Sequence, residues 1–210
     1  MRPFYNHPGF IQATLERVQD ALGAVPAPVR DRIQVVYTAH SIPVSMASTC
    51  DYVQQLQEVR KLVSKRLGQT GDALVYQSRS GPAGQPWLEP DVLDYLRAVK
   101  ERSLASAVVL APIGFISDHM EVLYDLDVEA RQLCDSLPLP MVRAKTVGVH
   151  PKFVAMIGEL IVERMNPGSE RRAWGTLGAR PDACPEDCCA RPRGSVPSPA
   201  SHQLGSKSVG

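Results

Sequence analysis

Short apolar runs rich in β-branched residues alternate along this chain with longer stretches of helical periodicity, and this alternation most constrains the fold. The runs at 33–38, 73–77 and 106–111 are too short to be helices, and 140–147 is a weaker fourth candidate. Strands that alternate with helices form βαβ units with a parallel sheet buried on both faces. The sequence therefore predicts an α/β domain, a Rossmann-like parallel sheet flanked by helices in three layers.

Five stretches have apolar residues at helical spacing. In the first, 11–22, these residues are Ile11, Leu15, Val18 and Leu22. The other four predicted helices are 52–67, 90–99, 120–137 and 151–165.

The composition changes after Met165, where Pro, Gly, Ser and Arg become frequent and apolar periodicity is lost. We therefore expect one α/β domain over residues 1–167, a cysteine-bearing extension over 168–189 and a disordered tail over 190–210.

The net charge of +1 and the lack of a concentrated basic patch argue against nucleic acid as a partner. No apolar run approaches the roughly 20 residues that cross a bilayer, and the first ten residues lack the apolar core of a secretory signal. We expect a cytoplasmic protein without a transmembrane segment. In that compartment burial or metal binding explains the five cysteines better than disulfides do.

Ligands of parallel α/β sheets bind at the carboxyl ends of the strands, so the residues after each strand are candidates. His40 follows the first predicted strand, and Trp87 lies in a long loop after the second. A lone histidine in such a place is more often a buried residue satisfied by the backbone. The tryptophan either fills an apolar gap or presents its face to a flat ligand. For His40 and for Trp87, the structural and the functional interpretation both stay open at this point.

The third strand leads into an acidic helix. Glu121, Asp125 and Glu129 are spaced at i, i+4 and i+8, so they share one helix face. Like charges stacked in this way repel, and a solvent-exposed face is the ordinary explanation. The row begins, however, beside His119 and at the same sheet edge as His40. Two imidazoles and several carboxylates suit a divalent cation such as Fe²⁺, or general acid–base chemistry.

Three segments together resemble the C-terminal half of the ferrochelatase family. They are TAHSIP at 38–43, QSRSGP at 77–82 with PWLEP at 86–90, and PIGFISDHMEVLYDLD at 112–127. Their order and intervals also resemble those of the family, over roughly residues 1–167. The resemblance implies a chelatase-like domain, one of the family's two, and a lyase of haem biosynthesis that inserts Fe²⁺ into a porphyrin with release of two protons.

The resemblance also implies roles for individual residues. His40 and Glu121 would face each other across the metal-insertion cleft, where they ligate Fe²⁺ and handle protons. Asp125 and Glu129 would form a secondary acidic row that conducts metal or protons. The substrate pocket would include Ser41, Ile42, Pro43, Trp87, Ser117 and His119, with Asp118 in support.

Three cysteines lie close together in the extension, at a spacing unlike that of a zinc finger, and exposed thiols are the simpler alternative. Some ferrochelatases hold a 2Fe–2S cluster with three C-terminal cysteines and one earlier cysteine. The resemblance therefore implies such a cluster on Cys50, Cys184, Cys188 and Cys189, with a structural or regulatory role, and associates the chain with the branch that uses coproporphyrin III. Cys134 lies in an apolar helical stripe, and we expect it to be buried.

The resemblance covers one of the family's two domains. The N-terminal domain, which supplies much of the porphyrin-binding surface, would have to come from the same gene or from a separate chain. Two hypotheses follow. Either the chain is the metal-handling half of an assembled enzyme, or it is a non-catalytic remnant that binds metal or a cluster without inserting iron.

Overall fold

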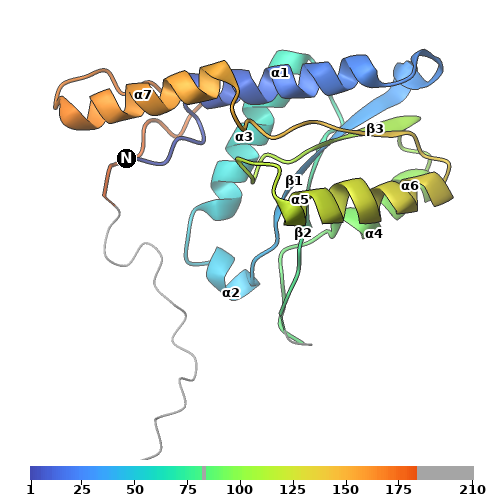
Figure 1. Ribbon diagram of the computed structural model, residues 1–210. Coiled ribbons are helices and arrows are strands. Elements are labelled where there is room, and N and C mark those ends of the chain that lie inside the picture. The colour runs from blue at the N-terminus through green and yellow to red at the C-terminus, as the bar shows by residue number, and fades with distance from the viewer. Residues whose placement is uncertain (82–83, 184–210) are drawn as a thin grey trace, which may run out of the picture.

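The computed structural model describes residues 1–81 and 84–183 of the 210-residue chain (Figure 1). Four strands form one fully parallel sheet in the order β2-β1-β3-β4, which confirms the predicted sheet. The fourth strand is shorter than its predicted range. The strands are β1 (Ile33–His40), β2 (Ala73–Gln77), β3 (Ala107–Ala111) and β4 (Met141–Arg143).

Helices cover both faces of the sheet, as predicted for three layers (Figure 1). On one face lie α1 (Pro8–Ala24), α3 (Tyr52–Leu67) and α7 (Pro151–Met165). On the other lie α4 (Val92–Glu101) and the helical segment α5 (Met120–Val122), a π-helix (Leu123–Ala130) and α6 (Arg131–Ser136). Two short helices connect elements, a 3-10 helix at Ala27–Arg32 and α2 at Val44–Ala47.

The central strand β3 divides its side chains between two apolar cores. Val109 packs toward α1, α3 and α7, whereas Val108 and Leu110 pack toward α4 and the π-helix. Successive strand residues point to opposite faces, so a strand covered on both sides must be apolar throughout. This requirement explains the uninterrupted apolar runs of the sequence.

The stretch 120–137 is helical, as expected, but it is not α-helical throughout. Its middle, Leu123–Ala130, is a π-helix, in which backbone hydrogen bonds span five residues instead of four. Leu126 and Ala130 are completely buried in the core against α4. The α-helical geometry assumed for the acidic row was therefore wrong over Leu123–Ala130, where the helix is wider.

Residues beyond α7 return to the domain and pack on α3. The backbone N–H of Trp174 donates to the Asn6 carbonyl at 2.8 Å, and the Arg66 guanidinium lies 3.9 Å from the centre of the Trp174 ring. The N–H of Thr176 donates to the buried Glu58 carboxylate at 2.7 Å. Residues 168–183 are thus attached to the domain. The predicted boundary between the domain and the extension at residue 167 stays a prediction. Residues 184–210, which include the predicted disordered tail, lie outside the described residues.

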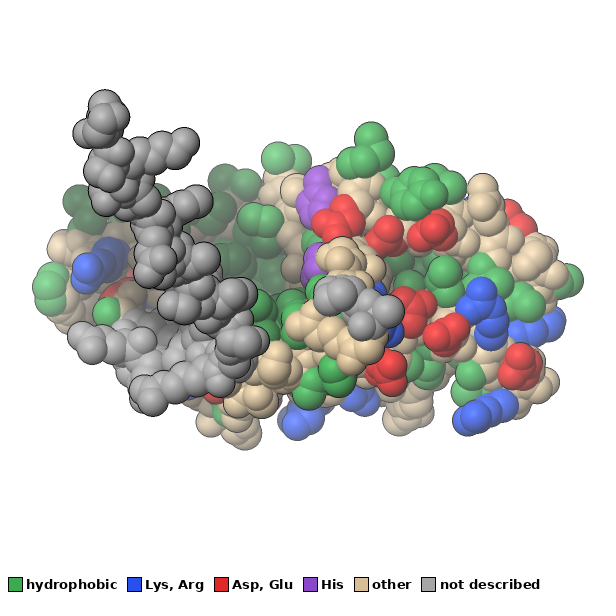
Figure 2. Space-filling model, turned by 90° about the horizontal axis from the view of Figure 1, so that it is seen from below, with side chains coloured by type: hydrophobic (Ala, Val, Ile, Leu, Met, Phe, Trp, Pro, Cys, Tyr) green, Lys and Arg blue, Asp and Glu red, His purple; other side chains and the backbone are tan. Residues whose placement is uncertain are grey.

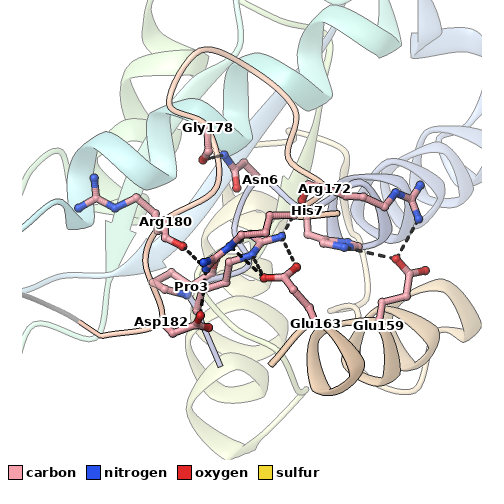
Figure 3. A network of polar contacts seen from close by, with 11 residues as sticks. Pro3, Asn6, His7, Glu159, Glu163, Arg172, Gly178, Arg180 and Asp182 are labelled. Atoms are coloured by element: carbon pink, nitrogen blue, oxygen red, sulfur yellow. Dashed lines mark hydrogen bonds and ion pairs between the residues drawn. The ribbon is translucent and has the colours of Figure 1, made fainter. Parts of the chain in front are cut away.

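A buried arginine links the N-terminal segment to α7 and to this extension. Figure 3 shows the polar network around Glu163 and Arg172 to which these contacts belong. The Arg2 side chain is fully buried, and its Nε donates to Glu163 Oε1 at 2.7 Å. Its Nη2 donates to the Arg172 carbonyl, also at 2.7 Å. A buried guanidinium is stable only when paired, so these bonds fasten both segments to the end of α7.

Across the described part of the chain, no helix has both the length and the apolar character needed to cross a membrane.

Gly114 is required where the loop after β3 passes over β1. A Cβ on Gly114 would lie 2.6 Å from the Ala39 Cβ and 2.8 Å from its Cα. We predict that Gly114→Ala lowers the free energy of unfolding by about 1–3 kcal/mol in urea denaturation, because buried backbone has to move. The control is Gly158→Ala in α7, where a Cβ meets nothing within 4 Å. It should raise stability by about 0.5–1 kcal/mol, and equal effects of the two variants would contradict the prediction.

Candidate active site

The carboxyl ends of the parallel strands lie at one edge of the sheet, beside a stretch that we call the acidic segment (residues 118–129). Figure 2 looks onto this edge and shows histidine side chains next to a row of acidic ones. The strand order reverses at β1, which has β2 on one side and β3 on the other. Open α/β sheets bind ligands at such a reversal.

His40 is the last residue of β1 and contacts the first carboxylate of the predicted row. Its Nε2 lies 3.1 Å from Glu121 Oε1, and the two side chains are 35% and 41% exposed, so a ligand can reach both. The Nδ1 of His40 is hydrogen-bonded to the Ser41 carbonyl. This bond directs Nδ1 toward the backbone, so Nε2 is the ring atom that faces Glu121. The structure thus brings together the pair proposed from the sequence.

Tyr52 supports this pair and was not among the predicted site residues. Its hydroxyl donates to the His40 carbonyl at 2.9 Å from the first turn of α3. Burial raises the pKa of this phenol to about 12, so it remains a donor at neutral pH. An isolated tyrosine at the start of an apolar helix carries no signal of this contact in the sequence.

The second carboxylate, Asp125, is bound by the end of β2. It accepts hydrogen bonds from Gln77 Nε2 at 3.2 Å and from the Ser78 hydroxyl. Gln77 is buried, and Ser78 has a left-handed backbone with φ of 63°. A buried glutamine ending an apolar strand was the available signal, which the sequence analysis did not use. Glu129, the third member of the row, is exposed.

Two further carboxylates of the acidic segment are bound by the end of β4. Arg143 Nη1 donates to Asp118 Oδ1 at 2.8 Å, while Nε and Nη2 donate to the two oxygens of Asp127 at 2.7 and 2.8 Å. Burial alone lowers the pKa of Arg143, but the bonds and charges of Asp127 and then Asp118 raise it above its usual value. No pattern in the sequence pointed to Arg143, because only the fold carries β4 to the acidic segment.

His119 does not join His40 at Glu121. It is exposed, and its ring packs edge-on against Phe115 with 5.3 Å between ring centres. Over the described residues, no three His, Cys, Asp or Glu side chains converge closely enough to hold a metal ion by themselves. A metal at His40 and Glu121 would therefore need further ligands from water or substrate.

The predicted pocket residues 41–43 are joined to the tryptophan loop. The Ser41 hydroxyl donates to the Leu88 carbonyl at 2.9 Å, and Pro43 forms an antiparallel bridge with Trp87. The half-buried Trp87 ring lies so close to Gly81 that a Cβ there would be 2.4 Å from it. These residues therefore gather beside His40, while Ser117 is exposed in the loop after β3.

The two described cysteines have different surroundings. Cys134 is buried, as predicted, and burial raises the pKa of its thiol to about 11. Cys50 is partly exposed, and its thiol donates to the Met46 carbonyl at 3.4 Å. The remaining cysteines proposed as cluster ligands, Cys184, Cys188 and Cys189, lie outside the described residues.

Comparison with known proteins identifies the class. The profile of the ferrochelatase family matches residues 1–165, so this chain belongs to that family. It is 50% identical over 192 residues to a ferrochelatase of Rhodopirellula baltica, covering 90% of this chain and 54% of that protein. It is 42% identical over 212 residues to the coproporphyrin III ferrochelatase of Streptomyces coelicolor, covering 90% of this chain and 55% of that protein. The chain thus spans about half the length of these relatives.

Among solved structures, a multi-domain protein from Deinococcus radiodurans, described as structurally similar to chelatases, matches with a TM-score of 0.48 and 23% identity. The match covers 81% of this chain and 32% of that protein. This likeness is too low to support an inference about function.

We predict that Cys50 and Cys134 react with thiol reagents at very different rates. In a variant with serine at 184, 188 and 189, Cys50 should react readily with Ellman's reagent at pH 8. A pKa of about 11 leaves about one Cys134 in a thousand as the reactive thiolate at that pH, so Cys134 should react at least about 100-fold more slowly. Denaturation should equalise the two rates. Equal rates in the native protein would contradict the burial of Cys134.

Proposed function

We propose that this chain is the metal-handling, C-terminal half of a ferrochelatase that inserts Fe²⁺ into coproporphyrin III in the cytoplasm. The observation that carries the proposal is the 3.1 Å contact between His40 Nε2 and Glu121 Oε1 at the ligand-binding edge of a chain of this family. The relative from Streptomyces coelicolor is a coproporphyrin III ferrochelatase, which supports coproporphyrin III as the porphyrin.

The reaction exchanges two pyrrole protons of the porphyrin for Fe²⁺, with no change of oxidation state. His40 Nε2 would ligate the arriving ion or take part in proton transfer, because Nδ1 is occupied by the Ser41 carbonyl and Nε2 faces Glu121. The Glu121 carboxylate is a suitable ligand for Fe²⁺ and a second proton acceptor. Asp125 and the exposed Glu129 would pass metal or protons between this pair and solvent.

The porphyrin would lie against the residues gathered beside His40. The part of a ferrochelatase that this chain does not cover would supply the opposing wall, either from the same gene or as a separate chain. The proposed substrate-pocket residues are Ser41, Ile42, Pro43, Trp87, Ser117 and His119.

Enzymatic activity tests the proposal. We expect the chain alone to show little loss of porphyrin fluorescence with Fe²⁺ under anaerobic conditions. Fusion to the N-terminal part of the Rhodopirellula baltica relative should give turnover, faster with coproporphyrin III than with protoporphyrin IX. In that fusion His40→Ala and Glu121→Gln should each lower turnover at least about 100-fold, because each removes a metal or proton acceptor.

The control in this assay is Glu129→Gln, which should retain more activity than Glu121→Gln because Glu129 is exposed and farther along the row. An inactive fusion that still binds metal would favour the non-catalytic remnant. Robust turnover by the chain alone would contradict the need for a second domain.

We further propose that Cys50, Cys184, Cys188 and Cys189 ligate a 2Fe–2S cluster. Of these four cysteines, only Cys50 lies within the described residues. The proposal is supported by the position of the extension, residues 168–183, relative to Cys50. The Arg180 guanidinium is paired with Asp51, the neighbour of Cys50. Cys184 follows Arg180 by four residues, which span at most about 14 Å. The extension therefore carries the chain toward Cys50. Bound there, the cluster would supply a structural or regulatory link, since iron insertion needs no electron transfer.

The cluster proposal predicts a coloured protein. Chain produced and purified anaerobically should show the visible absorption of a 2Fe–2S centre, and Cys50→Ser and Cys188→Ser should each abolish it because four thiolates are needed. Cys134→Ser is the matched control, since that thiol is buried in the core between the sheet and α4. This variant should keep the colour. A colourless unmodified chain would refute the cluster.

A further inference from the structure

One guanidinium contacts two carboxylates that lie on either side of Glu121 in the sequence. Arg143 bonds Asp118 through Nη1, and Asp127 through Nε and Nη2, at 2.7–2.8 Å. Asp118 Oδ1 also accepts from the Thr146 N–H at 3.2 Å. The two carboxylates therefore converge on one cation that belongs to the protein itself.

Exposure distinguishes the cation from its partners. The Arg143 side chain is 11% exposed, whereas those of Asp118 and Asp127 are 31% and 35% exposed. Solvent ions can therefore reach both carboxylates. Two convergent carboxylates without a cation are an oxygen site of the kind that hard divalent ions prefer. In this structure the guanidinium takes that place.

The five carboxylates of the acidic segment thus differ in their partners, and the exposed Glu129 has none among the described contacts. Asp118 and Asp127 are neutralised by Arg143, while Glu121 and Asp125 face His40 and the end of β2. Among the described contacts, a divalent ion approaching the segment finds Glu121, Asp125 and Glu129 without an arginine counterion.

We propose that Arg143 is a specificity-determining residue, which occupies the Asp118–Asp127 pair as a fixed internal cation and so directs the divalent metal to His40 and Glu121. This inference rests on the proposed function for the destination of the metal. The binding of Asp118 and Asp127 by Arg143 does not depend on the proposed function. The role needs a positive charge held between the two carboxylates, and the guanidinium reaches both at once through several donors.

The test counts Mn²⁺ ions bound to the 210-residue chain, from the electron paramagnetic resonance signal of free Mn²⁺. Mn²⁺ is a redox-stable probe that prefers carboxylate oxygen to thiolate, so the cysteines compete little. We expect Arg143→Gln to bind one more Mn²⁺ than the unmodified chain. Arg143→Gln combined with Asp127→Asn should lose that extra ion, because half of the vacated pair is then neutral.

The matched control is Arg97→Gln, which removes an exposed arginine paired with a single carboxylate, Asp94, at 2.7 Å. It should leave the count unchanged, and Arg143→Lys, which keeps a cation, should add no ion. If Arg143→Gln is unfolded without metal, as judged by circular dichroism, millimolar Mn²⁺ should restore the fold.

The outcomes separate this inference from the proposed function. An unchanged Mn²⁺ count in folded Arg143→Gln, or an unfolded variant that Mn²⁺ does not rescue, would overturn the role of Arg143. Glu121→Gln should remove an ion from the unmodified chain. If it does not, the metal-binding role in the proposed function fails, while the extra ion in Arg143→Gln still decides whether the guanidinium occupies the aspartate pair.

Discussion

The candidate site depends on one arrangement, the binding of the acidic segment by the last residues of three parallel strands. His40 ends β1 and contacts Glu121, Gln77 ends β2 and bonds Asp125, and Arg143 ends β4 and bonds the segment from the other side. Parallel pairing places all strand carboxyl ends at one edge. Residues more than 100 positions apart thereby converge on one short helix.

This arrangement also explains how the protein tolerates so many neighbouring negative charges. A row of carboxylates on an isolated helix would be destabilised by repulsion. Here Leu126 and Ala130 fix the opposite side of the π-helix in the core. Glu121 contacts the His40 imidazole, and Asp125, Asp118 and Asp127 receive hydrogen bonds from amide, hydroxyl and guanidinium groups. Packing energy holds the helix over the strand ends, where the charges find partners.

Part of the site could be predicted because local patterns encode it. His40 after a β-rich run and Glu121 after another could be assigned to one edge from the rule for parallel sheets alone. Arg143 could not, because β4 has only three residues and leaves little apolar pattern. The contacts of residues 168–183 with α3 were equally invisible, since this stretch has no apolar periodicity. Trp174 contacts Arg66 through its ring, and Thr176 bonds Glu58 through its backbone N–H.

The sequence by itself determined the alternation of strands and helices, the family, and the pair of side chains that most deserves testing, because apolar periodicity and motif spacing are local properties. Only the tertiary structure decided which carboxylates are free and which are occupied. Asp118 and Asp127 look equivalent to Asp125 in the sequence, yet a guanidinium from a distant strand neutralises them. The physical reason is that the neutralisation of a carboxylate depends on the groups that lie beside it in space, and the order of residues along the chain does not specify these neighbours.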